Sequence, residues 1–166
     1  PHHPVKTHRR VWGLSGAQPG ESARVRSNSF YLQRVLQEQT LAHAVAHPLY
    51  SINGKLDSIH VERLVLLFQH FEGINGLRDT LLSDLARNIL GQLTPEKLAE
   101  LADRHDLAPT HPEPWRKIFV GGSDDHGGKF LATAFTETTA GDNANECPHF
   151  LPSGSRFPKA EGGAPP

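Results

Sequence analysis

One short stretch of the chain concentrates residues that are able to bind a metal ion. Residues 121–128 read Gly-Gly-Ser-Asp-Asp-His-Gly-Gly, which places Asp124 and His126 two positions apart between two pairs of glycines. In an extended backbone, residues two apart project to the same side, so Asp124 and His126 would point together and Asp125 away. A carboxylate oxygen and an imidazole nitrogen suit a divalent metal. The competing interpretation is an acidic, glycine-rich surface turn that binds nothing.

Further polar side chains lie in two other short apolar stretches. His47 ends the stretch 43–47, and Glu72 and Asn75 belong to the stretch 71–75. His47 can supply a third metal ligand, or it can be a hydrogen-bonded histidine of the core. Glu72 can likewise do no more than fix a loop by accepting hydrogen bonds.

The sequence patterns of several other catalytic sites are missing. The chain contains no Gly-x-Ser-x-Gly and no Gly-x-x-x-x-Gly-Lys-Ser/Thr. Its single cysteine, Cys147, lies in a stretch without periodicity. We therefore expect no cysteine nucleophile, no internal disulfide and no cysteine-based zinc site.

Capping residues and apolar periodicity predict four helices that would position these side chains. Their expected ranges are 28–39, from 57 to about 68, 78–90 and 94–104. The last begins with Thr94-Pro95-Glu96, which combines a capping threonine with a proline at the first helical position. In the third, apolar side chains recur at spacings of three and four and predict one buried face, formed by Leu81, Leu82, Leu85, Ala86, Ile89 and Leu93.

Short apolar runs predict a buried strand at 43–47, two further strands at 71–75 and 117–120, and a short helix or strand at 130–136. Strands that alternate with helices are typical of a parallel sheet of βα units. In such sheets the functional groups gather at the carboxyl ends of the strands. The polar residues above all fall at these ends.

Composition excludes several classes of protein. Lys+Arg is 17 and Asp+Glu is 18, for a net charge of −1, which argues against a nucleic-acid-binding protein held by a broad basic surface. No run approaches the roughly 18 apolar residues of a membrane helix, and no signal peptide opens the chain. We therefore expect a cytoplasmic protein that binds neither nucleic acid nor membrane.

Length and the distribution of proline suggest one domain with loose ends. The chain has 166 residues, no methionine and proline-rich termini. We expect residues 1–26 to be loop or disorder, 27–138 to form the βα unit and 139–166 to be a disordered tail. The absence of methionine favours a piece of a longer protein.

Three motifs together resemble a known family. Ala46-His47-Pro48, Phe71-Glu72-Gly73-Ile74-Asn75-Gly76 and Gly122-Ser123-Asp124-Asp125-His126 are similar to the later motifs of the PHP (polymerase and histidinol phosphatase) superfamily of metal-dependent phosphoesterases. The similarity is greatest to PHP-domain proteins that occur alone or alongside bacterial glycosyltransferases. The resemblance implies a distorted seven-stranded βα barrel with two or three divalent metals, of which this α/β chain would be the C-terminal half.

The resemblance also implies roles for individual residues. His47 matches the histidine of the family's third motif, and Asp124 and His126 match its Asp-x-His motif, so these three would hold metal. Glu72 and Asn75 would support the ligands from behind. Arg78 follows directly and can meet a substrate phosphate, although a surface arginine at a helix start is the simpler interpretation.

The family's first motif, His-x-His, does not occur in this chain. The early histidines His2, His3 and His8 do not match it, so roughly half of the ligands are missing. We expect a phosphoesterase, or a fragment of one, that acts on a small phosphate ester with zinc, manganese or iron and has little activity alone. The alternative is a non-catalytic accessory module linked to a glycosyltransferase. Because three strands cannot close a barrel, we also expect self-association or a missing N-terminal part.

Overall fold

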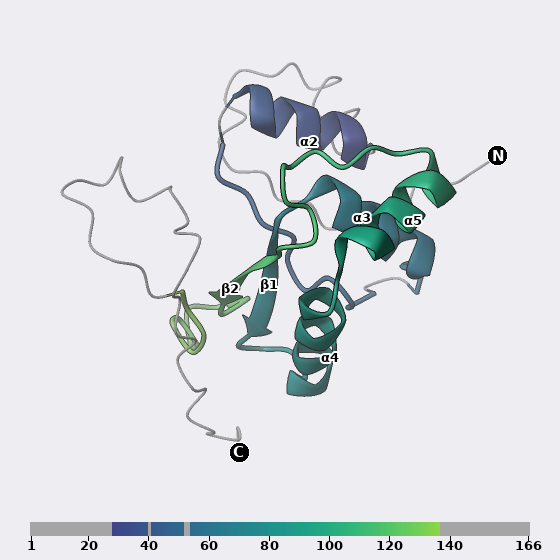
Figure 1. The fold of residues 1–166 in the computed structure, drawn as a ribbon. Helices are drawn as coiled ribbons and strands as arrows, with labels where there is room; N and C mark the ends of the chain where they lie inside the picture. The colour runs from purple at the N-terminus through teal and green to yellow at the C-terminus, as the bar shows by residue number, and fades with distance from the viewer. Residues whose placement is uncertain (1–27, 40, 52–53, 137–166) are drawn as a thin grey trace.

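The computed structural model describes residues 28–39, 41–51 and 54–136 (Figure 1). The expectations for residues 1–26, for the tail after Thr136 and for Cys147 lie outside these ranges. The elements follow in the order α2 (Ser29–Glu38), α3 (Ser58–Leu67), β1 (His70–Asn75), α4 (Thr80–Gly91), α5 (Pro95–His105) and β2 (Ile118–Gly122).

The predicted helix starts are confirmed where side chains cap them. The carboxamide oxygen of Asn28 accepts hydrogen bonds from two backbone N–H groups of α2, and Asp57 accepts one from the N–H of His60 in α3. Thr94 caps α5, with Pro95 at the first helical position. These caps satisfy N–H groups that a helix leaves without a partner in its first turn. Helix α4 begins two residues after the predicted start, with Asp79 as its cap.

The two strands are parallel, as the alternation of strands and helices predicts. β1 pairs with β2 in a register that runs from His70 opposite Ile118 to Asn75 opposite Gly122, with an irregularity at Gly73. On the other side of β1, Val45 forms a single parallel bridge to Phe71. All three segments therefore leave the sheet at the same edge. The described residues are too few to test the seven-stranded barrel, which stays a prediction.

Two of the predicted strand segments differ from the structure. Residues 43–47 form only the bridge at Val45, because His47 adopts a positive φ of 33° that ends the extended backbone. Their side chains are exposed or half-buried, so the expected buried strand is wrong. The stretch 130–136 consists of turns and bends, neither helix nor strand.

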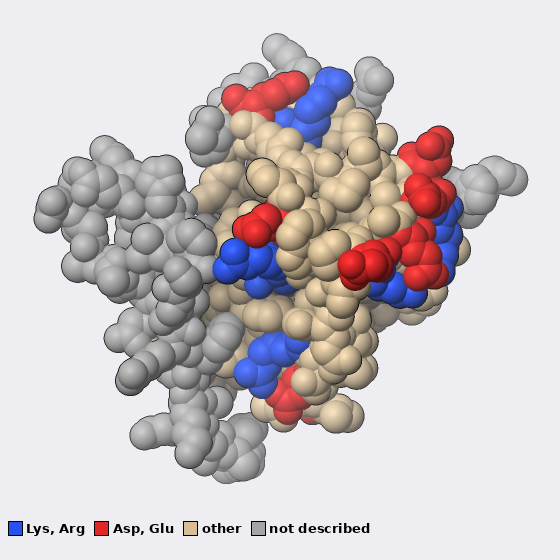
Figure 2. Space-filling model, in the orientation of Figure 1, with Lys and Arg blue, Asp and Glu red and all other residues tan. Residues whose placement is uncertain are grey.

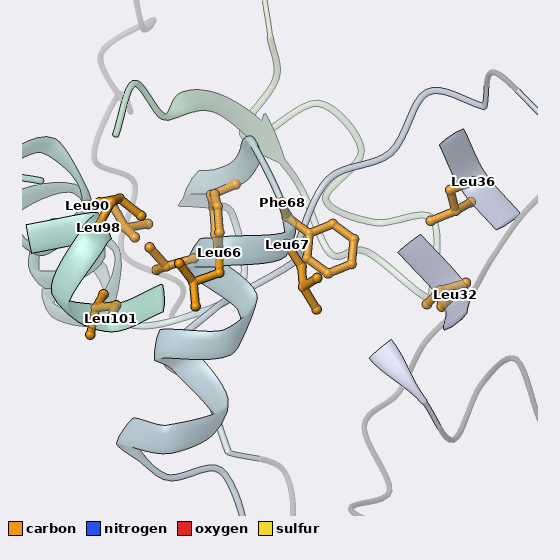
Figure 3. Packing of buried hydrophobic residues seen from close by; sticks show 10 residues of the cluster. Leu32, Leu36, Leu66, Leu67, Phe68, Leu90, Leu98 and Leu101 are labelled. Atoms are coloured by element: carbon orange, nitrogen blue, oxygen red, sulfur yellow. The ribbon is translucent and has the colours of Figure 1, made fainter. Parts of the chain in front are cut away.

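The core lies on both sides of the end of α3 (Figure 3). Leu66 of α3 packs near Leu90 of α4 and the α5 leucines Leu98 and Leu101, while residues of α2 lie on the opposite side. Burying one such side chain stabilises the fold by about 1.5–3 kcal/mol. Contacts of α3 with both α5 and α2 thus join the helices into one core.

The predicted buried face of α4 is only half right: Ala86 is buried, Leu82 is half-buried and Leu93 packs against the core. Ala86 and Leu90 are buried, but Leu81 is 67% exposed, and Leu85 and Ile89 are each 46% exposed. Helix α4 packs against β1. The residues facing it are those around Ala86 and Leu90, so the row formed by Leu81, Leu85 and Ile89 faces outward. Periodicity therefore predicts the amphipathic helix correctly but makes its buried face too wide on the side of Leu81, Leu85 and Ile89.

Polar groups complete the carboxyl end of α3, whose last carbonyls have no partner within the helix. The Nζ of Lys117 donates to the carbonyls of Val65 at 2.5 Å and Phe68 at 2.8 Å. Thr110 bonds the two carbonyls between them, with its N–H to Leu66 and its hydroxyl to Leu67. The loop before β2 is fixed to α3 by these four bonds.

Charged side chains on the face shown in Figure 2 gather in small mixed groups, in which blue basic atoms adjoin red acidic ones. One such group is the set of ion pairs that joins Arg104 of α5 to Glu62 and Glu100. Among the described residues, no helix is long and apolar enough to cross a membrane.

Candidate functional site at the carboxyl edge of the sheet

A small pocket, with room for about one water molecule, lies where the three parallel segments leave the sheet. Four of the residues singled out in the sequence line it: His47, Glu72, Asn75 and Arg78. The remaining lining residues are Pro48, Leu49, Tyr50, Leu82 and Ser83. His47 follows the bridge at Val45, Glu72 and Asn75 belong to β1, and Arg78 precedes α4. The parallel arrangement of the strands is what brings them together.

Glu72 is the central buried group of this edge, with only 8% of its surface exposed. Its Oε2 accepts hydrogen bonds from the backbone N–H of His47 at 2.6 Å and from Nδ2 of Asn75 at 2.9 Å. Its Oε1 lies against Gly122 of β2, where an added Cβ would come within 2.5 Å of it. Glu72 therefore contacts all three segments at the edge, and any larger residue at position 122 would require its carboxylate to shift.

Burial raises the pKa of the Glu72 carboxyl above its ordinary value. The hydrogen bonds from Asn75 and His47 oppose this rise, while the negative charge of Asp124 adds to it. The Asp124 carboxylate is thus close enough to repel a negative charge on Glu72.

Asn75 connects the end of β1 to the start of α4. Its Oδ1 accepts hydrogen bonds from the backbone N–H groups of Leu77 and Arg78, both at 3.0 Å. Since its Nδ2 is bonded to Glu72, the amide orientation is fixed from both sides. Asn75 therefore sets the direction in which Arg78 leaves the backbone.

Arg78 joins the pocket to the Asp-x-His segment. Its Nε donates to Oδ2 of Asp124 at 2.8 Å, and its guanidinium lies 4.2 Å from the centre of the Tyr50 ring. The side chains of Arg78 and Asp124 are 31% and 13% exposed, so the ion pair is partly shielded from water. Arg78 is the one Lys or Arg among the residues that line this pocket.

The Asp-x-His segment does not have the extended shape that the sequence predicts. Asp124 has a positive φ of 52°, so β2 ends before it and the two-residue alternation does not apply. Asp125 closes a turn by accepting hydrogen bonds from the N–H groups of Gly127, Gly128 and Phe130. These bonds, led by the one from Gly127, lower the pKa of Asp125.

His126 lies outside the pocket lining, with 56% of its side chain exposed. Its Nδ1 is 2.8 Å from the backbone carbonyl of Asp124 and 3.9 Å from Oδ1 of the same residue. Because a carbonyl only accepts, Nδ1 carries the proton and Nε2 has the lone pair that binds a metal. A histidine ligand commonly donates its other ring N–H to a carbonyl in this way.

A three-ligand metal group is not formed by the described residues. No set of three His, Cys, Asp or Glu side chains in this part of the chain is close enough to hold an ion together. Asp124 and His126 are neighbours, but His47 does not join them as a third ligand, and Oδ2 of Asp124 is taken up by Arg78. The side chains of Asp124 and His126 are of types that bind metal, but the described residues are not arranged as a metal-binding site.

Sequence reasoning missed Tyr50, which packs edge-on against His47 at 5.7 Å between ring centres and supports Arg78 from the other side. A tyrosine two residues after the His-Pro turn was the available signal.

Comparison of the chain with protein-family models, with curated proteins and with solved structures finds no match in any of the three.

Proposed function

We propose that this edge of the sheet belongs to a metal-dependent phosphoesterase site that acts on a small phosphate ester, such as a sugar or nucleoside phosphate, in the cytoplasm. The observation that carries the proposal is the convergence of His47, Glu72, Asn75 and Arg78 in one pocket, with Asp124 bonded to it. Three separate segments supply these groups at the edge where parallel sheets bind their ligands.

The chain's own residues have distinct tasks in this proposal. Arg78 offers its remaining N–H groups to a phosphate while Tyr50 holds the guanidinium plane. Glu72 and Asn75 keep the backbone of His47 and Arg78 in place by hydrogen bonds. Asp124 and His126 would be ligands of zinc, manganese or iron, and His47 would have to move toward them to become a third. A bound divalent ion would supply charge neutralisation and an activated water.

Because the described residues bring two donor groups together rather than three, we expect the isolated chain to be a weak hydrolase or an inactive one. The remaining ligands would come from a second polypeptide or from a longer form of this one. Equal phosphatase activity of this chain and of such a longer form would contradict the expectation.

The pairing of Asp124 with Arg78 favours a second candidate function. A carboxylate that is already neutralised by a guanidinium suits a module that binds a phosphate group without hydrolysing it. Such a non-catalytic module would accompany a glycosyltransferase, as the family resemblance suggests. The two candidates differ in whether the purified chain carries metal.

Metal content distinguishes them directly. The purified chain, Asp124→Asn and His47→Ala are analysed for bound zinc, manganese and iron, and their hydrolysis of p-nitrophenyl phosphate is measured. His60→Ala is the matched control, because His60 lies at the start of α3 and pairs with Asp57. We expect metal in the wild type and in the control, and its loss from Asp124→Asn. The same metal content in all four proteins would refute the ligand assignment.

A further inference from the structure

Three histidines and a lysine gather at the amino edge of the sheet, around the carboxyl end of α3. His43 packs edge-on against Phe68, with 5.7 Å between the ring centres, and Lys117 donates to the carbonyl of Phe68 at 2.8 Å. His70 begins β1, and His111 lies in the loop between α5 and β2. The three histidines influence one another electrostatically, and Lys117 acts on His111. These four basic groups therefore form one cluster.

The ring nitrogens of two of the histidines have no place for an additional proton. The Nδ1 of His43 lies 2.7 Å from the carbonyl of Leu41 and carries the proton, because a carbonyl only accepts. The Nε2 atoms of His43 and His111 are buried and have no hydrogen-bond partner among the residues that the structure describes. A proton added there would become a buried donor without an acceptor. The neutral form of both rings therefore fits this edge better than the charged form.

The charges that act on the cluster come from its own basic groups. Burial, followed by the charges of His43 and His111, lowers the pKa of His70 to about 4. Burial also lowers the pKa of His111, against a hydrogen bond to the backbone of Leu67, and the charges of Lys117 and His43 add to this shift. Each proton bound here therefore makes the next one harder to bind.

The charged side chains of the neighbouring segments pair with one another instead. In the loop, Glu113 pairs with Arg116, and in α2, Arg34 pairs with Glu38. All four of these side chains are more than half exposed. Their charges are screened by water and offer the buried rings little compensation.

A second buried histidine of the fold has the partner that the cluster lacks. The side chain of His105 in α5 is 6% exposed, and its Nε2 lies 2.5 Å from Oε2 of Glu62 in α3. This bond is the largest cause of the lowered pKa of Glu62. A proton on His105 is therefore matched by a carboxylate, so mild acid should leave the contact between α3 and α5 in place.

Polar contacts hold the middle of the loop that carries His111. Thr110, the preceding residue, donates to two carbonyls at the end of α3. It also accepts hydrogen bonds from Gln33 and Gln37 of α2, both at 3.2 Å, where the loop passes α2 (Figure 1). Apolar side chains near both ends of the loop pack against the core instead. The middle of the loop is therefore the part that a charge on His111 can displace.

We propose that this cluster is an acid-sensitive contact, in which protonation of His70 and His111 releases Thr110 and the middle of the loop from α2 and α3. In the attached loop both rings lie beside other basic groups, and release would separate His111 from them. The released form binds protons more tightly, so the attachment is complete above about pH 6.5 and is lost as the pH falls toward about 4. The inference is independent of the pocket at the carboxyl edge.

The test follows ¹H–¹⁵N spectra of the full chain from about pH 7.5 to 4. We expect the amide signals of Thr110 and His111 to leave their folded positions within this range, while those of Leu98 and Leu101 in α5 stay unchanged. Because two histidines take up protons on release, the transition should have a steepness of about two protons.

Two results with the wild type overturn the inference. If the signals of α5 are lost at the same midpoint as those of Thr110, acid unfolds the whole chain and the loop is not released separately. If Thr110 keeps its folded position down to about pH 4, the histidines gain their protons without release.

A variant assigns the protons to the cluster. His70→Gln should move the transition to lower pH and reduce its steepness to about one proton. His60→Gln is the matched control, because His60 lies at the start of α3 and its ring is bonded to a carboxylate, that of Asp57. The control should equal the wild type. An unchanged midpoint and steepness in His70→Gln would remove His70 from the contact and overturn the proposal.

Discussion

Replacing Lys117 with methionine tests how the loop before β2 is attached to α3. The Nζ of Lys117 donates to the carbonyls of Val65 and Phe68, and methionine has a similar length but no donor. The substitution leaves two shielded carbonyl oxygens without a hydrogen-bond donor, which lowers the free energy of unfolding by about 1–3 kcal/mol each. It also removes the cost of burying an ammonium group, which acts in the opposite direction. We expect a net loss of about 2 kcal/mol in the free energy of unfolding at pH 7.

The same residue gives this loss a definite pH dependence. Burial lowers the pKa of Lys117 from 10.5 to about 7. Between these values the unfolded chain binds the proton more tightly than the folded one, so the stability rises with pH across the window and stays flat below pH 7. The free energy of unfolding rises by at most 1.36 kcal/mol per pH unit, and by about half of that at pH 7, where Lys117 of the folded chain is half-protonated. The total rise between pH 7 and 9 is therefore about 2 kcal/mol.

Urea unfolding at pH 7, 8 and 9 measures this effect, with Lys129→Met, a change at an exposed lysine, as the control. The neutral amine keeps two N–H donors, so both carbonyl bonds persist at high pH. The difference between wild type and Lys117→Met should therefore grow by about 2 kcal/mol from pH 7 to 9. A constant difference would show that Lys117 titrates normally and would refute the reasoning.

Three further predictions concern other parts of the fold. Gly122→Ala should lower the free energy of unfolding by about 1–3 kcal/mol, because its Cβ would lie 2.5 Å from Oε1 of Glu72. This loss should be smaller when Glu72→Ala is already present, and purely additive effects in a double-mutant cycle would contradict the contact. Burial, together with the charges of two neighbouring histidines, lowers the pKa of His70 to about 4. The unfolded chain then binds the proton more tightly, so the free energy of unfolding should fall by roughly 1–2 kcal/mol from pH 6.5 to 4, after allowance for solvent screening. Thermal unfolding measures this fall, and His70→Gln should reduce it. Lysine at Leu81 and Leu85 should change stability by less than about 0.5 kcal/mol but reduce any self-association seen by sedimentation, and unchanged association would exclude this face of α4 as the contact.

The sequence was most informative where structure is decided locally. Asn28, Asp57 and Thr94 cap helices within three residues of themselves, so their effect is readable from the sequence alone. The strand at residues 43–47 depends on pairing with a segment about 25 positions away, and only Val45 pairs. The apolar row at Leu81 was assigned to the core because periodicity finds a face without showing what covers it.

The site divides in the same way. The strand order predicts that polar residues at the ends of parallel strands meet at one edge of the sheet. The structure places His47, Glu72 and Asn75 together there. The contact of Arg78 with Asp124 could not be foreseen, because a guanidinium reaches any carboxylate that the fold brings near it. The positive φ of Asp124 likewise depends on how the chain turns after β2 rather than on the motif itself.

The two edges of the sheet thus carry their polar groups for different purposes. At the amino edge, Lys117 and Thr110 donate hydrogen bonds to the last carbonyls of α3, which are backbone groups. At the carboxyl edge, by contrast, Asp124 pairs with a side chain, the guanidinium of Arg78. Removing Lys117 should therefore weaken the fold without changing the pocket, whereas removing Arg78 should change the charge of the pocket itself. Stability and ligand binding would then be separable in this chain by single substitutions.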